Sequence, residues 1–317
     1  MTFALATTRS GQALLVAGSK ALPLAAAGEP RGLTELLEDW QRAYPLLSAL
    51  AAEADRWRDA PGFDTFDLAA PYRPRQVFCT GANYRKHVIG LIMGDPSMRG
   101  AEHASETEEE RRARAEKLMD ERAKAELPYC FIKLPSCVIG PTDSVVLPRN
   151  VAKPDWELEL GVVIGRRARH VKAAEALDYV AGYAVVNDVT ARDLVFRRDG
   201  SALGADWLSG KCFPTFLPFG PLLVPRQFVA DPYDLTIRLA VNGKVYQNET
   251  TADMMIGIDR QIEFLSDRVE LLPGDVICTG SPYGNGAAFG LFLKPGDVME
   301  GSISGLGTQR VACVAEQ

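Results

Sequence analysis

The sequence predicts an α+β protein in which β-strands build most of the core. After residue 72, short apolar runs of strand length follow one another, separated by turns rich in glycine and proline. Residues 34–54 show helical spacing of apolar residues, and a charged stretch at 102–126 carries acid-base pairs typical of a helix. Strands and helices do not alternate regularly, which argues against a doubly wound parallel sheet. We therefore expect a small N-terminal α+β domain over residues 1–72 and a larger, mostly β domain over residues 73–317.

The expected N-terminal domain begins with a short strand at 13–17 and continues into a helix over 34–54. Apolar residues recur at helical spacing between 36 and 47, and Thr34 is a candidate N-cap. Pro45 should break or kink this helix, because proline lacks the backbone donor that a helix interior needs. Residues 60–74, with their prolines and glycine, are typical of a linker.

The larger domain should contain strands at 77–80, 129–133, 158–164, 181–186 and 235–241. Asn242 and Gly243 follow the last of these and predict a hairpin, since Asn-Gly suits the positive φ angles of a type I′ turn. A charged insertion at 92–128 interrupts the strands, and its acidic residues precede basic residues by four positions. A solvated surface helix is the simpler interpretation, and a lid formed by residues 88–128 is the alternative.

Composition excludes several classes of protein. The net charge of −6 and the pI near 5.3 argue against a nucleic-acid or anionic-membrane partner. No apolar run reaches membrane-spanning length. The 6 cysteines are scattered without Cys-X-X-Cys spacing, which indicates reduced thiols and a cytoplasmic location. With only 3 histidines and no paired cysteines, a zinc site is not expected.

Two glutamates stand one residue apart in an otherwise apolar strand. Successive side chains of a strand point to opposite faces, so Glu157 and Glu159 share one face. Asp188 follows a second apolar strand. Three such carboxylates suit a hard divalent cation, Mg²⁺ or Mn²⁺, although an isolated Glu-X-Glu is more often a pair of solvated side chains.

Four segments in this order resemble the fumarylacetoacetate hydrolase family over roughly residues 73–308: GANYRKH at 81–87, WELE at 156–159, NDVTARD at 187–193 and GDVICTGSP at 274–282. The resemblance implies a mixed β-roll catalytic domain, a homodimer, and Mg²⁺ or Mn²⁺ bound by the residues matching Glu157, Glu159 and Asp188. It also implies small-molecule substrates with a 2-oxo acid head. Family members include acylpyruvate hydrolases, oxaloacetate decarboxylases or tautomerases, and decarboxylase/isomerases of aromatic catabolism, which share an enolate intermediate.

The matching positions suggest further site residues. Lys133 and Lys211 match family lysines and would act in catalysis by stabilising oxyanion charge, the alternative being ordinary surface lysines. Three further residues would bind the substrate: Arg192, Ser281 and Tyr84. Arg192 could instead pair with a nearby acid.

His87 is the candidate catalytic base, because imidazole accepts a proton near neutral pH. Two positions depart from the family pattern. Family hydrolases often carry Glu three residues after this histidine, where this chain has Gly90, and often carry Gln where it has Val195. Glu102 or Glu106 of the insertion could replace the missing acid.

The sequence thus predicts a metal-dependent enzyme acting on a 2-oxo or 2,4-dioxo acid. Hydrolytic C–C cleavage of an acylpyruvate-like substrate is the leading reaction. An isomerase, tautomerase or decarboxylase using the same enolate is the alternative among enzymes. A catalytically inactive metal-binding protein is the alternative from another class.

Overall fold

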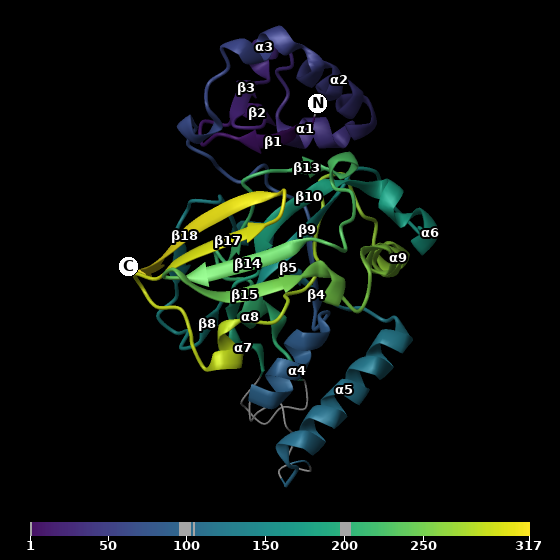
Figure 1. Ribbon diagram of the computed structural model, residues 1–317, viewed down its shortest axis with the longest axis vertical. Coiled ribbons are helices and arrows are strands. Elements are labelled where there is room, and N and C mark those ends of the chain that lie inside the picture. The colour runs from purple at the N-terminus through teal and green to yellow at the C-terminus, as the bar shows by residue number, and fades with distance from the viewer. Residues whose placement is uncertain (1, 95–102, 104, 197–203) are drawn as a thin grey trace.

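The computed structural model describes residues 2–94, 103, 105–196 and 204–317. Two large β-sheets form the body of the molecule, and a three-stranded sheet, β1–β2–β3, lies at one end (Figure 1). The larger sheet has the order β13–β10–β9–β16–β4–β5, and the second has the order β15–β14–β17–β18–β7. The predicted α+β class with a strand-built core is confirmed.

The six-stranded sheet contains β13 (Val224–Pro225), β10 (Val180–Asn187), β9 (Leu158–Ile164), β16 (Val276–Cys278), β4 (Val77–Gly81) and β5 (Tyr129–Lys133). The β16–β4 pair is parallel, whereas the other neighbours are antiparallel, so the sheet is mixed. Each strand expected here from the sequence lies within one or two residues of its expected bounds.

The five-stranded sheet contains β15 (Lys244–Thr250), β14 (Thr236–Val241), β17 (Val298–Ile303), β18 (Gly307–Ala315) and β7 (Val145–Leu147). The hairpin between β14 and β15 pairs Val241 with Lys244. Asn242 and Gly243 have φ angles of 51° and 79°, as a type I′ turn requires. Short strands complete the fold: β6 (Val138–Ile139), β8 (Pro154–Asp155), β11 (Thr190–Ala191) and β12 (Leu217–Pro218).

Strand β9 divides its side chains between two environments. Its apolar residues at alternate positions are buried in the core shared with β14 and β17: Leu158, Leu160, Val162 and Ile164. The sheets approach closely at Gly301, where an added Cβ would lie 2.5 Å from Cδ1 of Leu158. Glu159, between these apolar residues, therefore points to the opposite face of β9.

The N-terminal sheet consists of β1 (Ala4–Thr7), β2 (Ala13–Ala17) and β3 (Lys20–Pro23), followed by α1 (Leu33–Glu38), α2 (Trp40–Ala52) and α3 (Ala54–Arg58). The expected break at Pro45 is wrong, because α2 continues through it, and a kink there stays a prediction. The helix breaks instead at Asp39, whose φ of −125° and ψ of 42° are not helical. The N-cap of α1 is Gly32 and not Thr34. Leu5 exchanges backbone hydrogen bonds of 2.9 and 2.8 Å with Leu223, which joins this sheet to β13. A domain boundary at residue 72 stays a prediction.

Helices α4 (Arg85–Gly94) and α5 (Glu108–Ala125) lie at the end of the molecule far from the N-terminal sheet (Figure 1). Helix α5 is the charged insertion, and it buries Ala115 and Met119 against Val88 and Ile92 of α4. It is therefore a packed helix, and its action as a lid stays a prediction. The remaining helices are α6 (Ala173–Ala176), α7 (Arg192–Val195), α8 (Trp207–Lys211) and α9 (Ile258–Arg268). Within the described ranges, no helix has both the length and the apolar character needed to cross a bilayer.

Candidate metal centre and active-site cavity

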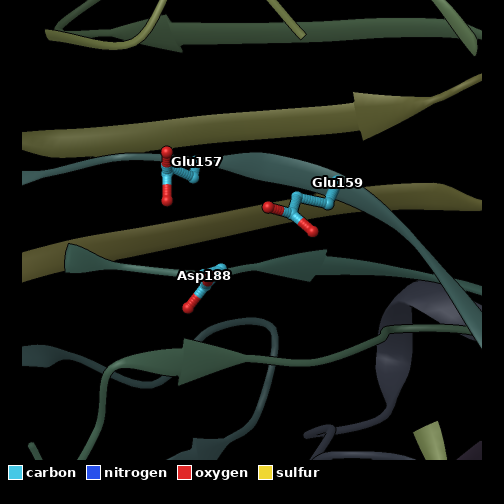
Figure 2. A group of neighbouring side chains, drawn as sticks. All are labelled: Glu157, Glu159 and Asp188. Atoms are coloured by element: carbon cyan, nitrogen blue, oxygen red, sulfur yellow. The ribbon is translucent and has the colours of Figure 1, made fainter. Parts of the chain in front are cut away.

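Three buried carboxylates converge at the edge where β9 begins and β10 ends. Glu157, Glu159 and Asp188 each offer an oxygen, and these oxygens lie within 4.8 Å of one another (Figure 2). The antiparallel β9–β10 register pairs Asn187 with Leu158 and so places Asp188 beside Glu157. The Asp188 N–H donates to the Glu157 carbonyl at 2.9 Å, which fixes this juxtaposition.

Three basic side chains surround this carboxylate cluster. Lys211 donates to Oε2 of Glu157 and to Oδ2 of Asp188, each at 2.5 Å. Lys133 is fully buried and donates to Asp188 and, at 2.8 Å, to the carbonyl of Val189.

Arg192 contacts Oε1 of Glu157 at 2.5 Å and Oδ2 of Asp155 at 2.8 Å. It thus pairs with nearby acids, as one of the two sequence interpretations expected. Asp155 was not anticipated from the sequence. Its carboxylate is completely buried and also accepts a hydrogen bond of 2.6 Å from the Gly286 N–H, so it anchors Arg192 to the loop after β16. An acid two residues before the Glu-X-Glu pair was the available signal.

The carboxylates differ in their electrostatic surroundings. Burial opposes ionisation of Glu157, but Arg192 and Lys211 outweigh it and hold the Glu157 pKa well below its usual range. Burial raises the pKa of Glu159 well above its usual range, and the neighbouring Asp188 raises it further. The hydrogen bond to Glu159 that the structure shows comes from the Gly280 N–H, at 2.8 Å.

The residues at this centre fit a divalent cation. The donor set is oxygen only, which suits Mg²⁺ or Mn²⁺. No cationic side chain of the described chain forms an ion pair with Glu159, so a bound cation would relieve the mutual repulsion of Glu159 and Asp188. This is a divalent-metal site built from Glu157, Glu159 and Asp188.

His87, on α4, lies beside the carboxylates. Its Nε2 is 3.9 Å from Oε1 of Glu157, and its buried Nδ1 has no hydrogen-bond partner among the residues that the structure describes. Burial lowers the pKa of His87 to about 4, so the imidazole is uncharged at neutral pH. An uncharged imidazole with Nε2 facing the carboxylates is able to accept a proton there.

A cavity of about 1080 Å³ opens over the metal centre. Most of the site residues expected from the sequence line it: His87, Glu157, Glu159, Asp188, Arg192, Lys211 and Ser281. Two do not. Tyr84 is fully buried, and Lys133 lies behind Asp188. A substrate contact for Tyr84 and a catalytic role for Lys133 stay predictions. The Ser281 hydroxyl, which faces the cavity, accepts a hydrogen bond of 3.1 Å from Gln247.

Both positions that depart from the family pattern, Gly90 and Val195, are closely packed against neighbouring residues. A Cβ placed on Gly90 would lie 2.5 Å from Cε2 of Tyr283, and a Cβ on Gly210 would lie 2.5 Å from Cγ2 of Val195. Glu106, one candidate for the missing acid, binds Arg114 instead, at 2.8 Å. Glu102, the other candidate, lies outside the described residues.

Comparisons with known proteins agree with this geometry. The family model described as fumarylacetoacetate (FAA) hydrolase C-terminal matches residues 76–314. The human protein named oxaloacetate tautomerase FAHD2A, mitochondrial, is 37% identical over 280 residues, which cover 88% of this chain and 78% of that protein. A Dictyostelium discoideum protein named fumarylacetoacetate hydrolase domain-containing protein 2 homolog is 36% identical over 252 residues, covering 76% of this chain and 72% of that one.

Solved structures are also similar. A probable 2-hydroxyhepta-2,4-diene-1,7-dioate isomerase from Mycobacterium abscessus superposes with a TM-score of 0.77 at 28% identity, covering 100% of both chains. Maleylpyruvate hydrolase from Sphingobium, solved with manganese(II) and pyruvate, gives a TM-score of 0.72 at 25% identity, covering 99% of this chain and 100% of that one. The chain therefore belongs to the fumarylacetoacetate hydrolase family and is one of its metal-dependent enzymes.

Proposed function

We propose that this enzyme interconverts the keto and enol forms of a 2-oxo acid of the oxaloacetate type. The observation that carries the proposal is the turn of α4 that holds His87 and Gly90. It offers a buried neutral imidazole for proton transfer, but Tyr283 fills the space where a second, water-orienting acid would stand. Tautomerisation needs the proton transfer and needs no water. The human relative named as an oxaloacetate tautomerase supports the same choice.

The roles follow from the contacts. A bound Mg²⁺ or Mn²⁺ would supply Lewis-acid chemistry that polarises a ketone and makes its α-protons more acidic. His87 accepts at Nε2 the proton from the carbon next to the ketone and delivers it to the enolate oxygen, which gives the enol; the reverse transfers restore the ketone. Lys211, which is charged and lines the cavity, stabilises the negative charge of the enolate. Lys133 holds Asp188 in place, and so acts as a positioning residue.

The substrate head binds beside the carboxylates. Arg192 and Ser281 both line the cavity, and their donors suit the 1-carboxylate of a 2-oxo acid. Asp155 keeps the guanidinium of Arg192 oriented through its contact of 2.8 Å. Mg²⁺ is the metal that we propose for the working enzyme.

Hydrolytic C–C cleavage, the reaction that the sequence ranks first, becomes the second candidate. The volume of the cavity favours it, since about 1080 Å³ exceeds what a four-carbon acid occupies and leaves room for an acyl group. Hydrolysis requires an activated water, however, and no described acid other than the metal-site carboxylates lies beside His87. Decarboxylation uses the same enolate and shares this second rank.

Product analysis tests the proposal. Purified protein is incubated with oxaloacetate and with a 2,4-dioxo acid, with and without Mg²⁺, and the products are followed by NMR. We expect metal-dependent exchange between tautomers with conserved mass. Formation of two carboxylic acids would establish hydrolysis, and release of CO₂ would establish decarboxylation.

The assembly and the compartment are part of the proposal as well. A homodimer is supported by apolar side chains exposed around the edge strand β5, notably Ile132 (59% exposed) and Leu208 (67%). Light scattering on the purified protein tests it.

A cytoplasmic location is supported by the cysteines, which are all free thiols in the described structure. The human relative carries the word mitochondrial in its name, so localisation of a tagged protein decides between the compartments.

A further inference from the structure

Two cysteines meet beside the active site. Cys137 follows the end of β5, and Cys212 directly follows Lys211 at the end of α8. The Cys137 thiol donates a hydrogen bond to the sulfur of Cys212. Cys137 Sγ also lies 4.0 Å from the carbonyl oxygen of Lys211, and Cys212 Sγ lies 3.9 Å from the carbonyl oxygen of Ile132. The thiol pair therefore bridges the chain segments that carry Lys133 and Lys211.

These two segments hold Asp188 from both sides. Lys133 donates to its Oδ1, and Lys211 donates to its Oδ2 at 2.5 Å. Lys211 also donates to Oε2 of Glu157 at 2.5 Å. Because Cys212 is the next residue in the chain, a displacement of its sulfur moves the backbone of Lys211 and, with it, the ammonium at the site.

The two thiols differ in exposure and in ionisation. Cys137 is fully buried, whereas Cys212 is half-buried. The hydrogen bond from Cys137 outweighs the effect of burial and lowers the pKa of Cys212 below its ordinary value. The thiolate is the reactive form of cysteine, and an accessible thiolate next to a second thiol is typical of redox-sensitive sites.

A second pair of cysteines shows what distinguishes the first. Cys79 of β4 and Cys278 of β16 are register partners, and their side chains share a hydrogen bond. Both are buried, with 1% and 0% exposure, and burial raises the pKa of Cys79 well above its usual range. Neither thiol is open to an oxidant, so this pair should stay reduced.

We propose that Cys137 and Cys212 form a site of oxidative modification, at which a hydroperoxide joins their sulfurs in a disulfide and thereby displaces Lys211. The Cys212 thiolate attacks the O–O bond of hydrogen peroxide, which gives a sulfenic acid and releases hydroxide. The Cys137 sulfur then attacks the Cys212 sulfur, the S–O bond breaks, and the hydroxyl group leaves with the Cys137 proton as water. One thiolate, one thiol and one peroxide thus give one disulfide, one water and one hydroxide.

The disulfide should lower turnover by moving Lys211. A covalent S–S bond is much shorter than a hydrogen-bonded contact between two sulfurs, so its formation draws residue 212 toward residue 137. A misplacement of about 1 Å at an active site can cost about 100-fold in rate, and we expect a loss of about 10–100-fold. The inference rests on the proposed function for the role of Lys211 at the enolate, so the loss should fall on kcat and not on KM.

The experiment treats the Mg²⁺-loaded enzyme with hydrogen peroxide and then with dithiothreitol. Turnover is measured for whichever reaction the product analysis establishes, and mass spectrometry of peptides prepared without reductant identifies the disulfide. The variants are Cys212→Ser and, in case serine disturbs folding, Cys212→Ala. Cys130→Ser is the matched control, because Cys130 is also half-buried but contacts Thr80, at 3.8 Å.

Peroxide should produce a Cys137–Cys212 disulfide in the wild type and in Cys130→Ser, lower kcat by about 10–100-fold, and leave Cys79 and Cys278 reduced. Dithiothreitol should restore the rate, and the Cys212 variants should keep their turnover in peroxide. The proposal is overturned if the disulfide does not form, if Cys212 links two copies of the chain instead, or if the disulfide leaves turnover unchanged. Failure of the proposed function shows itself differently, as absent tautomerisation of oxaloacetate by the fully reduced enzyme.

Discussion

Gly90 and Tyr283 share one space: a Cβ on Gly90 would lie 2.5 Å from Cε2 and 2.6 Å from Cδ2 of the tyrosine ring. The absence of a side chain at position 90 is therefore matched by an aromatic ring from the loop after β16. Tyr283 belongs to the same loop as Ser281, which lines the cavity. The position where family hydrolases often carry an acid on α4 is therefore occupied here by the Tyr283 ring.

Gly90→Glu should destabilise the protein. Forcing a side chain into this contact costs about 1–3 kcal/mol, as overpacked cores do, and a lower melting temperature will show it. The double variant Gly90→Glu/Tyr283→Ala should recover part of the loss and gain hydrolysis of a 2,4-dioxo acid, because the glutamate then has room beside His87. If Gly90→Glu alone gains hydrolysis at wild-type stability, the two residues do not exclude one another.

Glu159→Gln should abolish metal binding without unfolding the protein. The amide is nearly isosteric but uncharged, and it removes a like charge from beside Asp188, so the metal-free variant should be at least as stable as the wild type. For the wild type, Mn²⁺ at 100 times its dissociation constant should add about 2.7 kcal/mol to the free energy of unfolding. Thermal unfolding with and without Mn²⁺ measures both effects. Glu175→Gln, an exposed substitution on α6, is the control and should behave as wild type.

His87→Ala should lower turnover by about 10²–10⁴-fold, the usual contribution of a general base. Mn²⁺ and oxalate binding should persist, since His87 is 3.9 Å from Glu157 and forms no hydrogen bond that holds the carboxylates. His170→Ala is the matched control, because this histidine is exposed and pairs with Asp267. Steady-state kinetics measures the loss of turnover, and calorimetry measures the binding of Mn²⁺ and oxalate. Full activity in His87→Ala would make the histidine structural.

Met119→Ala should loosen α5 from α4. Deleting a fully buried methionine side chain costs about 2–5 kcal/mol, and here the loss falls on the small cluster that docks the helix. Hydrogen exchange in α5 should accelerate while exchange in β9 stays slow. Leu118→Ala, at an exposed neighbouring position (40%), should have little effect. Uniformly faster exchange across the sheets would contradict local docking.

Local pattern accounted for the strands and the metal site. Alternation in β9 was sufficient to place Leu158 in the core and Glu159 on the opposite face, and the Asn-Gly pair was sufficient for the β14–β15 hairpin. The helix break was misplaced: α2 continues through Pro45, and the residue with a non-helical backbone is Asp39.

The surroundings of the site depended on contacts between residues far apart in the chain. No residue near Gly90 in the sequence points to Tyr283 as its neighbour. Asp155 and Arg192 form an ion pair although they are 37 positions apart in the chain. Such pairings are products of the tertiary fold, and a single acid before the Glu-X-Glu pair does not identify its partner.

The rate of enol-to-keto conversion of oxaloacetate tests the central claim most directly. The decay of enol absorbance is followed with Mg²⁺-loaded wild type, with chelator-treated wild type and with Glu159→Gln, against the uncatalysed rate. The account predicts acceleration by the loaded wild type only, with mass conserved by NMR. Equal acceleration by the chelator-treated protein, or cleavage of substrate into two acids without tautomer exchange, would contradict it.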